Sequence, residues 1–310
     1  MFSFSTLIAP LSIDEFLSSI WPEVPAHIPG TARKLATLTK EAPELISAED
    51  LLANYPDRVS LLRPDGFFAS VPNGTTALPF YRAEYTAFVR RIERHISHLG
   101  DIAANMADVL GMPRSSFGCD LFMSSGNESL HSRNISGLAM HSDAEVSFAL
   151  LLEGKKRWSW APNSHIKNQT TTVNRDGDRP VDPQELLLAD EIPMPASMPA
   201  DCQRVEAVAG DLIFLPRGWW HTTQAEGKCM QLNFTLSGPM LIEVVTKALA
   251  ANLRKDQRWR QYAYDIRNPE TGDLRSQLSI LLGELATQLT FPNAAQDICH
   301  DYLTLPHKGL

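Results

Sequence analysis

Three residues of this chain combine the types and the spacing of a metal site. His141 and Asp143 stand two positions apart in the run MHSD. If the segment 137–160 begins as a strand, side chains two apart point to the same face, so an imidazole and a carboxylate project into the same space. A third ligand is available at His221, which ends the run GDLIFLPRGWWH. We expect His141, Asp143 and His221 to hold one metal ion.

The ligand set of the predicted site indicates its chemistry. Two histidines and one carboxylate on one side of an ion leave the opposite positions open, as in non-haem Fe(II) oxygenases. Lys156 lies 13 residues after Asp143, just beyond a turn expected at Glu153-Gly154. A strand leading away from the metal and a neighbour leading back would place Lys156 beside the site. Its ammonium would there bind the distal carboxylate of a chelated acid as a point charge.

The composition of the whole chain narrows the classes of protein and partner. The 310 residues carry a formal net charge of -8, which argues against a nucleic-acid surface and permits a basic protein or peptide partner. The four cysteines are scattered without a CxxC pair, as for free thiols in a reducing compartment. The N-terminus does not have the pattern of a signal peptide, and no apolar run approaches the ~20 residues of a membrane helix. We therefore expect a cytoplasmic protein without a membrane segment.

Helices and short strands are expected before the metal-binding region. Capping boxes precede two apolar runs, at Ser12 with Glu15 and at Ser47 with Asp50. Short strands are expected over residues 59–62 and 67–71, around a Pro64-Asp65-Gly66 turn. Residues 83–110 have helical apolar spacing, which predicts two helices divided at Gly100-Asp101.

The middle of the chain reads as strands with turn signals between them, which predicts a sandwich or a barrel. The expected strands cover residues 119–126, 137–147, 148–152, 157–160, 203–208, 211–215 and 229–236. The long polar segment 162–201 interrupts them. It is either a lid or substrate-recognition loop at the mouth of the site, or a solvated insertion with a short helix near residues 183–189.

The chain becomes helical again from Met240. One leucine stripe there packs either within the chain or against a second copy, so a homodimer through the C-terminal helices is a possibility that the sequence leaves open. The stripe consists of Leu274, Leu278, Leu281, Leu282, Leu285 and Leu289. The expected organisation is a helix-rich cap over residues 1–115 packed on the barrel, a catalytic barrel over residues 116–239 and a helical region over residues 240–310.

Residues 121–237 resemble the jumonji-C (JmjC) family of 2-oxoglutarate-dependent oxygenases. The resemblance rests on MHSD, on EGKKRW, and on GDLIFLPRGWWH followed by MQLNF, and it is nearest to the bacterial cupin-like and asparaginyl-hydroxylase-like members. The opening LSIDEFLSSIWPEVPAHIPG is similar to the start of such proteins. The resemblance implies a mainly β fold with flanking helices. Its core would be a double-stranded β-helix of the cupin jelly-roll type, with an N-terminal helical cap and a C-terminal helical segment.

The resemblance also assigns roles within the site. His141, Asp143 and His221 match the Fe(II) ligands, and Lys156 matches the basic residue that binds the distal carboxylate of 2-oxoglutarate. The implied reaction uses O2 and decarboxylates 2-oxoglutarate to succinate and CO2 while a C–H bond of the substrate is hydroxylated. Removing a metal ligand should abolish it.

Further polar positions match the cosubstrate pocket of the family. Asn233 and Ser147 match positions that line this pocket in some members, although a longer polar side chain is usual at the second. Leu138 departs from the pattern, because related hydroxylases often have a threonine there. A hydroxyl from Ser124 or Ser125 on the neighbouring strand would replace it.

Four other charged or titratable residues lie near these positions in the sequence. Glu145 follows Asp143 by two positions, so it either contacts substrate or lies at the rim of the site. Lys155 should point away from the face of Lys156, into solvent. His131 and Arg133 precede the MHSD run, either on the surface or at the substrate entrance.

Three functions compete on this sequence. The leading one is an Fe(II)/2-oxoglutarate hydroxylase that acts on a side chain of a peptide or protein. The second applies the same chemistry to a free amino acid or a natural-product intermediate. The third is a non-enzymatic cupin that binds a metal or a ligand. Succinate formation separates the third from the other two, and the shape of the groove near the 162–201 segment separates the first from the second.

Overall fold

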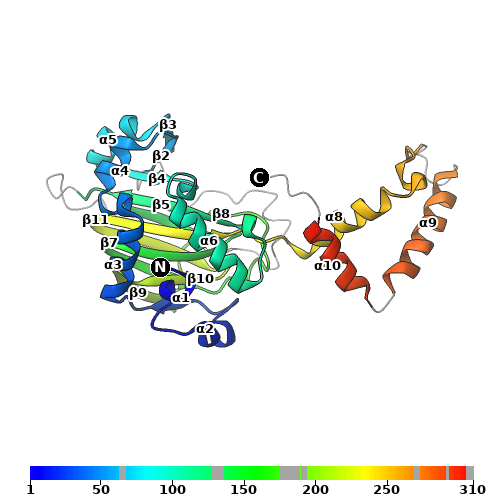
Figure 1. Ribbon diagram of the computed structural model, residues 1–310, viewed down its shortest axis with the longest axis horizontal. Coiled ribbons are helices and arrows are strands. Elements are labelled where there is room, and N and C mark those ends of the chain that lie inside the picture. The colour runs from blue at the N-terminus through cyan, green and yellow to red at the C-terminus, as the bar shows by residue number, and fades with distance from the viewer. Residues whose placement is uncertain are drawn as a thin grey trace. The chain divides into compact units, whose positions relative to one another are not determined.

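The fold is described from a computed structural model, which covers residues 1–62, 68–126, 136–174, 189, 194–264, 266–267, 273–290 and 293–304. The chain divides into two compact units, Met1–Gly238 and Pro239–Leu310. The first unit carries the strands that hold the predicted metal ligands, and the second is helical (Figure 1). Each unit is described by itself.

The first unit is built on a large antiparallel sheet. Its main path runs in the order β1-β10-β7-β11-β5-β4-β2-β3, and β6, β8 and β9 pair off this path. The strands are β1 (Ala26–Ile28), β2 (Val59–Leu62), β3 (Phe68–Val71), β4 (Thr86–Val89), β5 (Phe117–Ser124), β6 (Ser136–Ser142), β7 (Val146–Ala161), β8 (Val173–Asn174), β9 (Gln203–Val208), β10 (Leu212–Leu215) and β11 (Trp220–Leu236). Strands are present at all the positions expected from the sequence in this region, but their bounds differ. β5 lies two residues earlier than expected, and the expected strand 137–147 is interrupted after Ser142. The strands expected at 148–152 and 157–160 are one strand, β7, and β11 begins nine residues before residue 229.

Two long strands, β7 and β11, build both halves of the core. The first half of β7 pairs with β10 and with the end of β11, whereas its second half pairs with β9 and with the start of β11. The register between them shifts between Glu226 and Gln231. The turn expected at Glu153-Gly154 is wrong, because β7 continues through it. Gly154 has a positive φ of 85°, which bends the strand without ending it.

The backbone conformation at Gly154 leads to a testable prediction. A Cβ added there would lie 2.0 Å from the carbonyl oxygen of Lys228, whereas a Cβ added at Gly227, which also has a positive φ, meets nothing within 4 Å. Left-handed backbone costs roughly 1–3 kcal/mol for a residue with a side chain. We expect Gly154→Ala to lose clearly more unfolding free energy than Gly227→Ala in chemical denaturation. Equal losses would mean that the close approach to Lys228 is not required.

Helices cover one face of the sheet. They are α1 (Phe4–Leu7), α2 (Ile13–Ser19), α3 (Ala32–Glu41), α4 (Ala48–Asn54), α5 (Gly74–Arg82) and α6 (Ser97–Leu110), with short 3-10 turns η1 (Pro43–Ile46), η2 (Ile92–Arg94) and η3 (Arg114–Ser116). The capping box at Ser12 is confirmed, since Ser12 Oγ accepts from the Glu15 amide and Glu15 accepts from the Ser12 amide. Ser47 caps α4 as expected.

The main apolar core lies between these helices and the sheet. Alternate β7 residues Phe148 and Leu150 face it, and Phe148 packs edge-on against Phe4 at 5.9 Å between ring centroids. The intervening residues Ala149 and Leu151 belong to a second cluster with Trp158, on the opposite face. Because strand side chains alternate, the second face is free to carry the polar groups of a site.

The segment 83–110 differs from its expected form. Thr86–Val89 forms β4, paired with β2 and β5, and α6 begins only at Ser97 and runs through Gly100 without a break. Phe88 stacks on Phe122 of β5 at 4.3 Å. The helical spacing of Tyr85 and Phe88 misled because pairing with two strands decides the local structure.

The second unit consists of α8 (Leu241–Leu253), η4 (Gln257–Arg260), α9 (Asp273–Leu289) and α10 (Ala294–Thr304). Lys247 of α8 lies 5.8 Å from the ring of Tyr302 in α10. On α9, Leu274 and Leu281 are buried, whereas Leu278 is 39% and Leu282 53% exposed. The leucine stripe is thus only partly covered. Among the helices in the described ranges, none is long and apolar enough to cross a membrane.

Candidate metal centre

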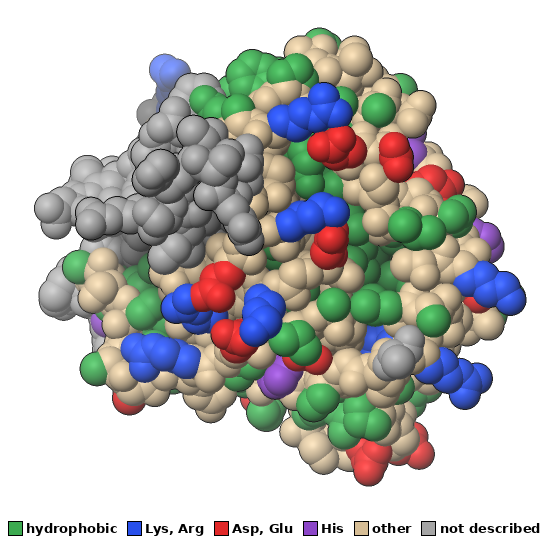
Figure 2. Space-filling view, turned by 90° about the vertical axis from the view of Figure 1, so that its left-hand side faces the viewer, with side chains coloured by type: hydrophobic (Ala, Val, Ile, Leu, Met, Phe, Trp, Pro, Cys, Tyr) green, Lys and Arg blue, Asp and Glu red, His purple; other side chains and the backbone are tan. Residues whose placement is uncertain are grey.

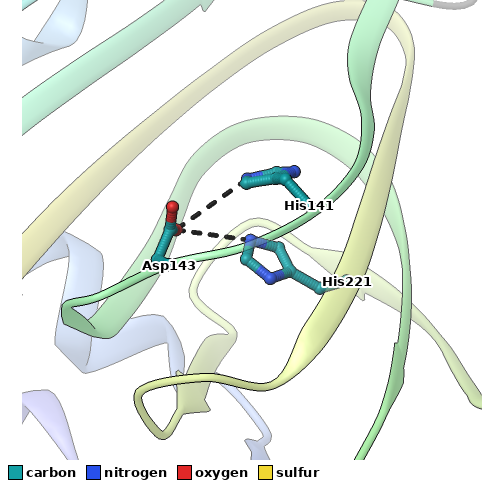
Figure 3. A group of neighbouring side chains, drawn as sticks. All are labelled: His141, Asp143 and His221. Atoms are coloured by element: carbon teal, nitrogen blue, oxygen red, sulfur yellow. Dashed lines mark ion pairs between the residues drawn. The ribbon is translucent and has the colours of Figure 1, made fainter. Parts of the chain in front are cut away.

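The three predicted ligands lie together, as Figure 3 shows. His141 is on β6, Asp143 follows that strand, and His221 is the second residue of β11, directly opposite His141 in the strand pairing. The Oδ2 atom of Asp143 is 3.8 Å from His141 Nε2 and 3.5 Å from His221 Nε2. All three ligand atoms lie within 4.8 Å of one another. One ion can therefore contact all three, while their role as ligands stays a prediction.

Backbone carbonyls fix the orientation of both imidazoles. Nδ1 of His141 donates to the carbonyl of Ala139 at 2.7 Å, and Nδ1 of His221 donates to that of Trp219 at 3.0 Å. Since a carbonyl only accepts, the proton sits on Nδ1 and the Nε2 lone pair faces the shared point. Burial, reinforced by neighbouring His141, lowers the pKa of His221 to about 3. The ring is thus kept in the neutral form that binds a metal.

Asp143 is held from the side away from the histidines. Its Oδ1 accepts from the Thr172 hydroxyl at 3.2 Å, and its backbone carbonyl accepts from the Gly218 amide at 2.8 Å. The side chain is 32% exposed, in contrast to the two buried imidazoles. Sequence reasoning missed Thr172, because it is 29 residues from Asp143 and belongs to no spaced motif.

Lys156 is a buried cation on the second half of β7. It is 6% exposed, and its Nζ lies 5.6 Å from the ring centroids of both Phe122 and Trp158. Among the residues that the structure describes, this ammonium contacts the two rings and forms no ion pair with a carboxylate. Burial lowers the pKa of Lys156. A buried cation without a counter-ion favours an anionic ligand.

The ammonium also lies near the metal ligands. Its charge contributes to the lowered pKa of His221. Trp158, two residues along β7 from Lys156, stacks on the His221 ring at 6.0 Å between centroids. Phe122 and Trp158, which sequence reasoning did not single out, form the aromatic walls around Lys156.

The predicted cosubstrate positions fall on neighbouring strands. Asn233 pairs with Ala149, two residues along β7 from Ser147. The Ser147 hydroxyl is buried without a partner in the described structure. The Asn233 carbonyl oxygen accepts from Gln231 at 2.8 Å, which leaves its amide nitrogen to donate. Gln231 is a second residue that sequence reasoning missed.

The two serines proposed in place of a threonine differ in their contacts. The Ser124 hydroxyl hydrogen-bonds with that of Thr86 at 3.0 Å, whereas the Ser125 hydroxyl is buried without a partner among the described residues. The side chain of Leu138 lies outside the described part of the structure.

The charged neighbours of the site are also placed. Glu145 accepts from the Ser237 hydroxyl at 2.6 Å, so this carboxylate is already engaged away from the histidines. Lys155 is exposed, as expected, and pairs with Glu206 at 3.2 Å. His131 and Arg133 lie outside the described residues.

The segment 162–201 is described over residues 162–174, 189 and 194–201. Its first part is not a solvated insertion, because Ile166 and Val173 are buried in a cluster with Met140 and Trp220. The helix expected near residues 183–189 falls, apart from residue 189, outside the described ranges.

The visible surface carries charges of both signs. On the face in Figure 2, basic and acidic side chains are interspersed rather than gathered into a patch of one sign. Exposed ion pairs such as Arg82–Glu49 at 2.8 Å and Lys228–Glu153 at 2.9 Å fit this pattern. The described side chains on this face therefore form no basic patch of the kind that binds nucleic acid.

Comparisons with known proteins agree with this architecture. Residues 103–236 match the model of the cupin-like domain. An uncharacterized protein of Bacillus subtilis, YxbC, is 23% identical over 279 residues, which cover 83% of this chain and 78% of that protein. YcfD of Escherichia coli has a similar fold, with a TM-score of 0.53 at 14% identity over 92% of this chain and 69% of YcfD.

A second solved structure of YcfD describes a ribosomal oxygenase in complex with cobalt and 2-oxoglutarate. It has a TM-score of 0.51 at 13% identity, over 95% of this chain and 71% of YcfD. The likeness shows the fold. Together with the domain match, it confirms the expected cupin-type barrel core with flanking helices.

Proposed function

Residues 103–236 match the cupin-like domain, and from that premise we propose that this chain is a JmjC-type oxygenase that depends on Fe(II) and 2-oxoglutarate. The observation that carries the proposal is a candidate metal site beside a buried cation. An open-sided set of two imidazoles and one carboxylate lies close to a buried lysine that has no counter-ion among the described residues. The first suits a ferrous ion with open positions, and the second suits the far carboxylate of a dicarboxylic acid.

Each residue of the site has a definite task in this proposal. His141, Asp143 and His221 would hold Fe(II), which supplies O2 activation coupled to decarboxylation of 2-oxoglutarate to succinate and CO2. Lys156 would bind the distal carboxylate of 2-oxoglutarate between two aromatic rings. Asn233 and Ser147 would donate further hydrogen bonds to it. The walls around Lys156 would exclude water from the reacting groups.

We propose that the substrate is a side chain of a peptide or protein and that one of its C–H bonds is hydroxylated. YcfD, which has a similar fold, is described as a ribosomal oxygenase, and that description supports a protein substrate. A cytoplasmic location is part of the proposal. The free state of all four cysteines, Cys119, Cys202, Cys229 and Cys299, supports it.

The test is succinate formation by the purified protein with Fe(II), 2-oxoglutarate and O2. Candidate peptides, whole ribosomes and free amino acids would be supplied in parallel, and products would be searched by mass spectrometry for one added oxygen atom. Succinate and an oxidised peptide are expected together. An oxidised free amino acid alone would replace the protein substrate by a small molecule. The absence of succinate with every substrate would favour a cupin that only binds its ligand.

We also propose that the α9 leucine face pairs with that of a second copy, because exposed apolar side chains on one helix favour association. Leu278 and Leu282 lie one turn apart and are both exposed. Replacing both with serine is expected to shift a dimer to monomer in light scattering after size exclusion, whereas Gln288→Ser on the same helix leaves the mass unchanged. A monomeric wild type would contradict this proposal and leave the oxygenase proposal intact.

A further inference from the structure

The segment 163–174, here termed the clamp segment, is bonded to the residue between two predicted metal ligands. Ser142 stands between His141 and Asp143 and is fully buried. Its carbonyl accepts from Gln169 Nε2 at 2.6 Å, and its hydroxyl donates to Gln169 Oε1. Gln169 is itself 1% exposed, so both bonds are shielded from water. The backbone of the ligand pair is thereby fixed by one side chain from a distant part of the chain.

The same segment determines which oxygen of Asp143 faces the metal position. Thr172 donates to Oδ1, while Oδ2 is the atom near both Nε2 nitrogens. A carboxylate that bound the ion through both oxygens would occupy one more coordination position than a carboxylate that bound through one. In the proposed reaction three protein ligands, 2-oxoglutarate and O2 would share the ion, so a second oxygen of Asp143 would compete with them. The Thr172 hydroxyl favours the one-oxygen mode.

The clamp segment is also anchored at its C-terminal end and at its middle. Strand β8 pairs with β6, with Asn174 opposite His141 and Val173 opposite Ser142. Asn168 accepts from Arg217 Nη2 at 3.0 Å, in the turn that leads to His221. The segment therefore contacts the chain beside both histidines. Preorganisation of this kind is how outer residues set the affinity of a metal site.

We propose that Thr172 and Gln169 are positioning residues of the metal centre. Thr172 holds Asp143 as a one-oxygen ligand, and Gln169 holds the backbone that carries His141 and Asp143. The inference rests on the proposed metal site and goes beyond it. It assigns this task to a segment that the sequence marks as a loop.

The proposal has a reciprocal consequence. If the clamp segment favours the metal-binding arrangement, then a bound metal must stabilise the clamp segment by the same free energy. Metal binding should therefore slow amide hydrogen exchange in residues 163–174 as well as at the ligands themselves. If the segment only packed beside the site, substitution of Thr172 would not change this metal-dependent slowing of exchange.

The test measures Co(II) binding to chelator-treated protein, by the visible absorption of the bound ion. Thr172→Val keeps the shape of the side chain and removes the hydroxyl, so the dissociation constant is expected to rise about 10- to 100-fold. Thr172→Ser restores the donor and should bind nearly as tightly as wild type. Thr171→Val changes the exposed neighbouring threonine and should have no effect. Circular dichroism of each variant checks that its fold is intact.

Two results would overturn the proposal in distinguishable ways. If the wild-type protein binds no Co(II), both the proposed metal centre and the proposed role of the clamp segment are wrong. Wild-type affinity in Thr172→Val, with unchanged metal-dependent exchange over residues 163–174, would remove the clamp alone. A Thr172→Val variant with weak Co(II) binding and a reduced exchange effect, both restored in Thr172→Ser, is the result expected.

Discussion

Asp143→Ala is expected to abolish succinate formation and to weaken metal binding by more than the roughly hundredfold that loss of an outer-sphere partner causes. The carboxylate is the only charged group in the predicted ligand set, and its Oδ2 lies within 4 Å of both imidazole nitrogens. Without it, only the two imidazoles would remain as ligands, and a hard ferrous ion would lose its anionic ligand. Co(II) titration and a succinate assay measure the two effects separately.

A nearby carboxylate provides the control for this variant. Glu145 lies two residues from Asp143 but is engaged by the Ser237 hydroxyl. Glu145→Gln removes a similar charge from the same region, and Co(II) binding should be retained. Full turnover in Asp143→Ala, with normal metal content, would end the assignment of the three ligands. Loss of binding in both variants would show instead that general negative charge, and not the ligand geometry, retains the ion.

Lys156→Met is expected to change cosubstrate binding and stability in opposite directions. The ammonium is buried without a counter-ion in the described structure, and burial already lowers its pKa, so its charged form costs stability in the absence of ligand. A methionine fills a similar volume between Phe122 and Trp158 and needs no counter-ion. The free energy of unfolding without ligand should rise by about 1 kcal/mol or more. The concentration of 2-oxoglutarate needed for turnover should rise by about a hundredfold, since a charge-assisted contact is lost.

The neighbouring lysine separates this effect from a general loss of positive charge. Lys155 is exposed and paired with Glu206, so Lys155→Met should leave both quantities nearly unchanged. Thermal unfolding without ligand and succinate formation against 2-oxoglutarate concentration are the measurements. A Lys156→Met protein that is less stable and has an unchanged 2-oxoglutarate requirement would show that this lysine has a packing role only.

The grouping of the three predicted ligands was accessible to sequence reasoning because each of them belongs to a short spaced motif. His141 and Asp143 lie two residues apart at the end of β6, and the turn before His221 brings that residue to the start of β11, opposite His141. The position of Lys156 was predicted from a wrong premise. It is reached by one continuous strand that bends at Gly154 rather than by a turn and a returning neighbour.

Other parts of the site depend on contacts between distant residues. Thr172 and Gln169 reach Asp143 and Ser142 from 27 to 29 residues away, through a segment without regular periodicity. The strand at Thr86–Val89 is likewise decided by its two partners and not by its own apolar spacing. The spacing of the predicted ligands was therefore read correctly, whereas the strand at Thr86–Val89 and the outer contacts of the site required the folded chain.

The continuous strand β7 sets the distance between two parts of the proposed binding site. Ser147, before the bend, and Lys156, after it, are parts of one hydrogen-bonded strand, and the buried ammonium lies 5.6 Å from the centroids of two aromatic rings. The span from the ion to this ammonium is then fixed by backbone geometry. Under the proposed function, β7 therefore selects the chain length of the cosubstrate, so that 2-oxoglutarate binds and shorter or longer keto diacids do not.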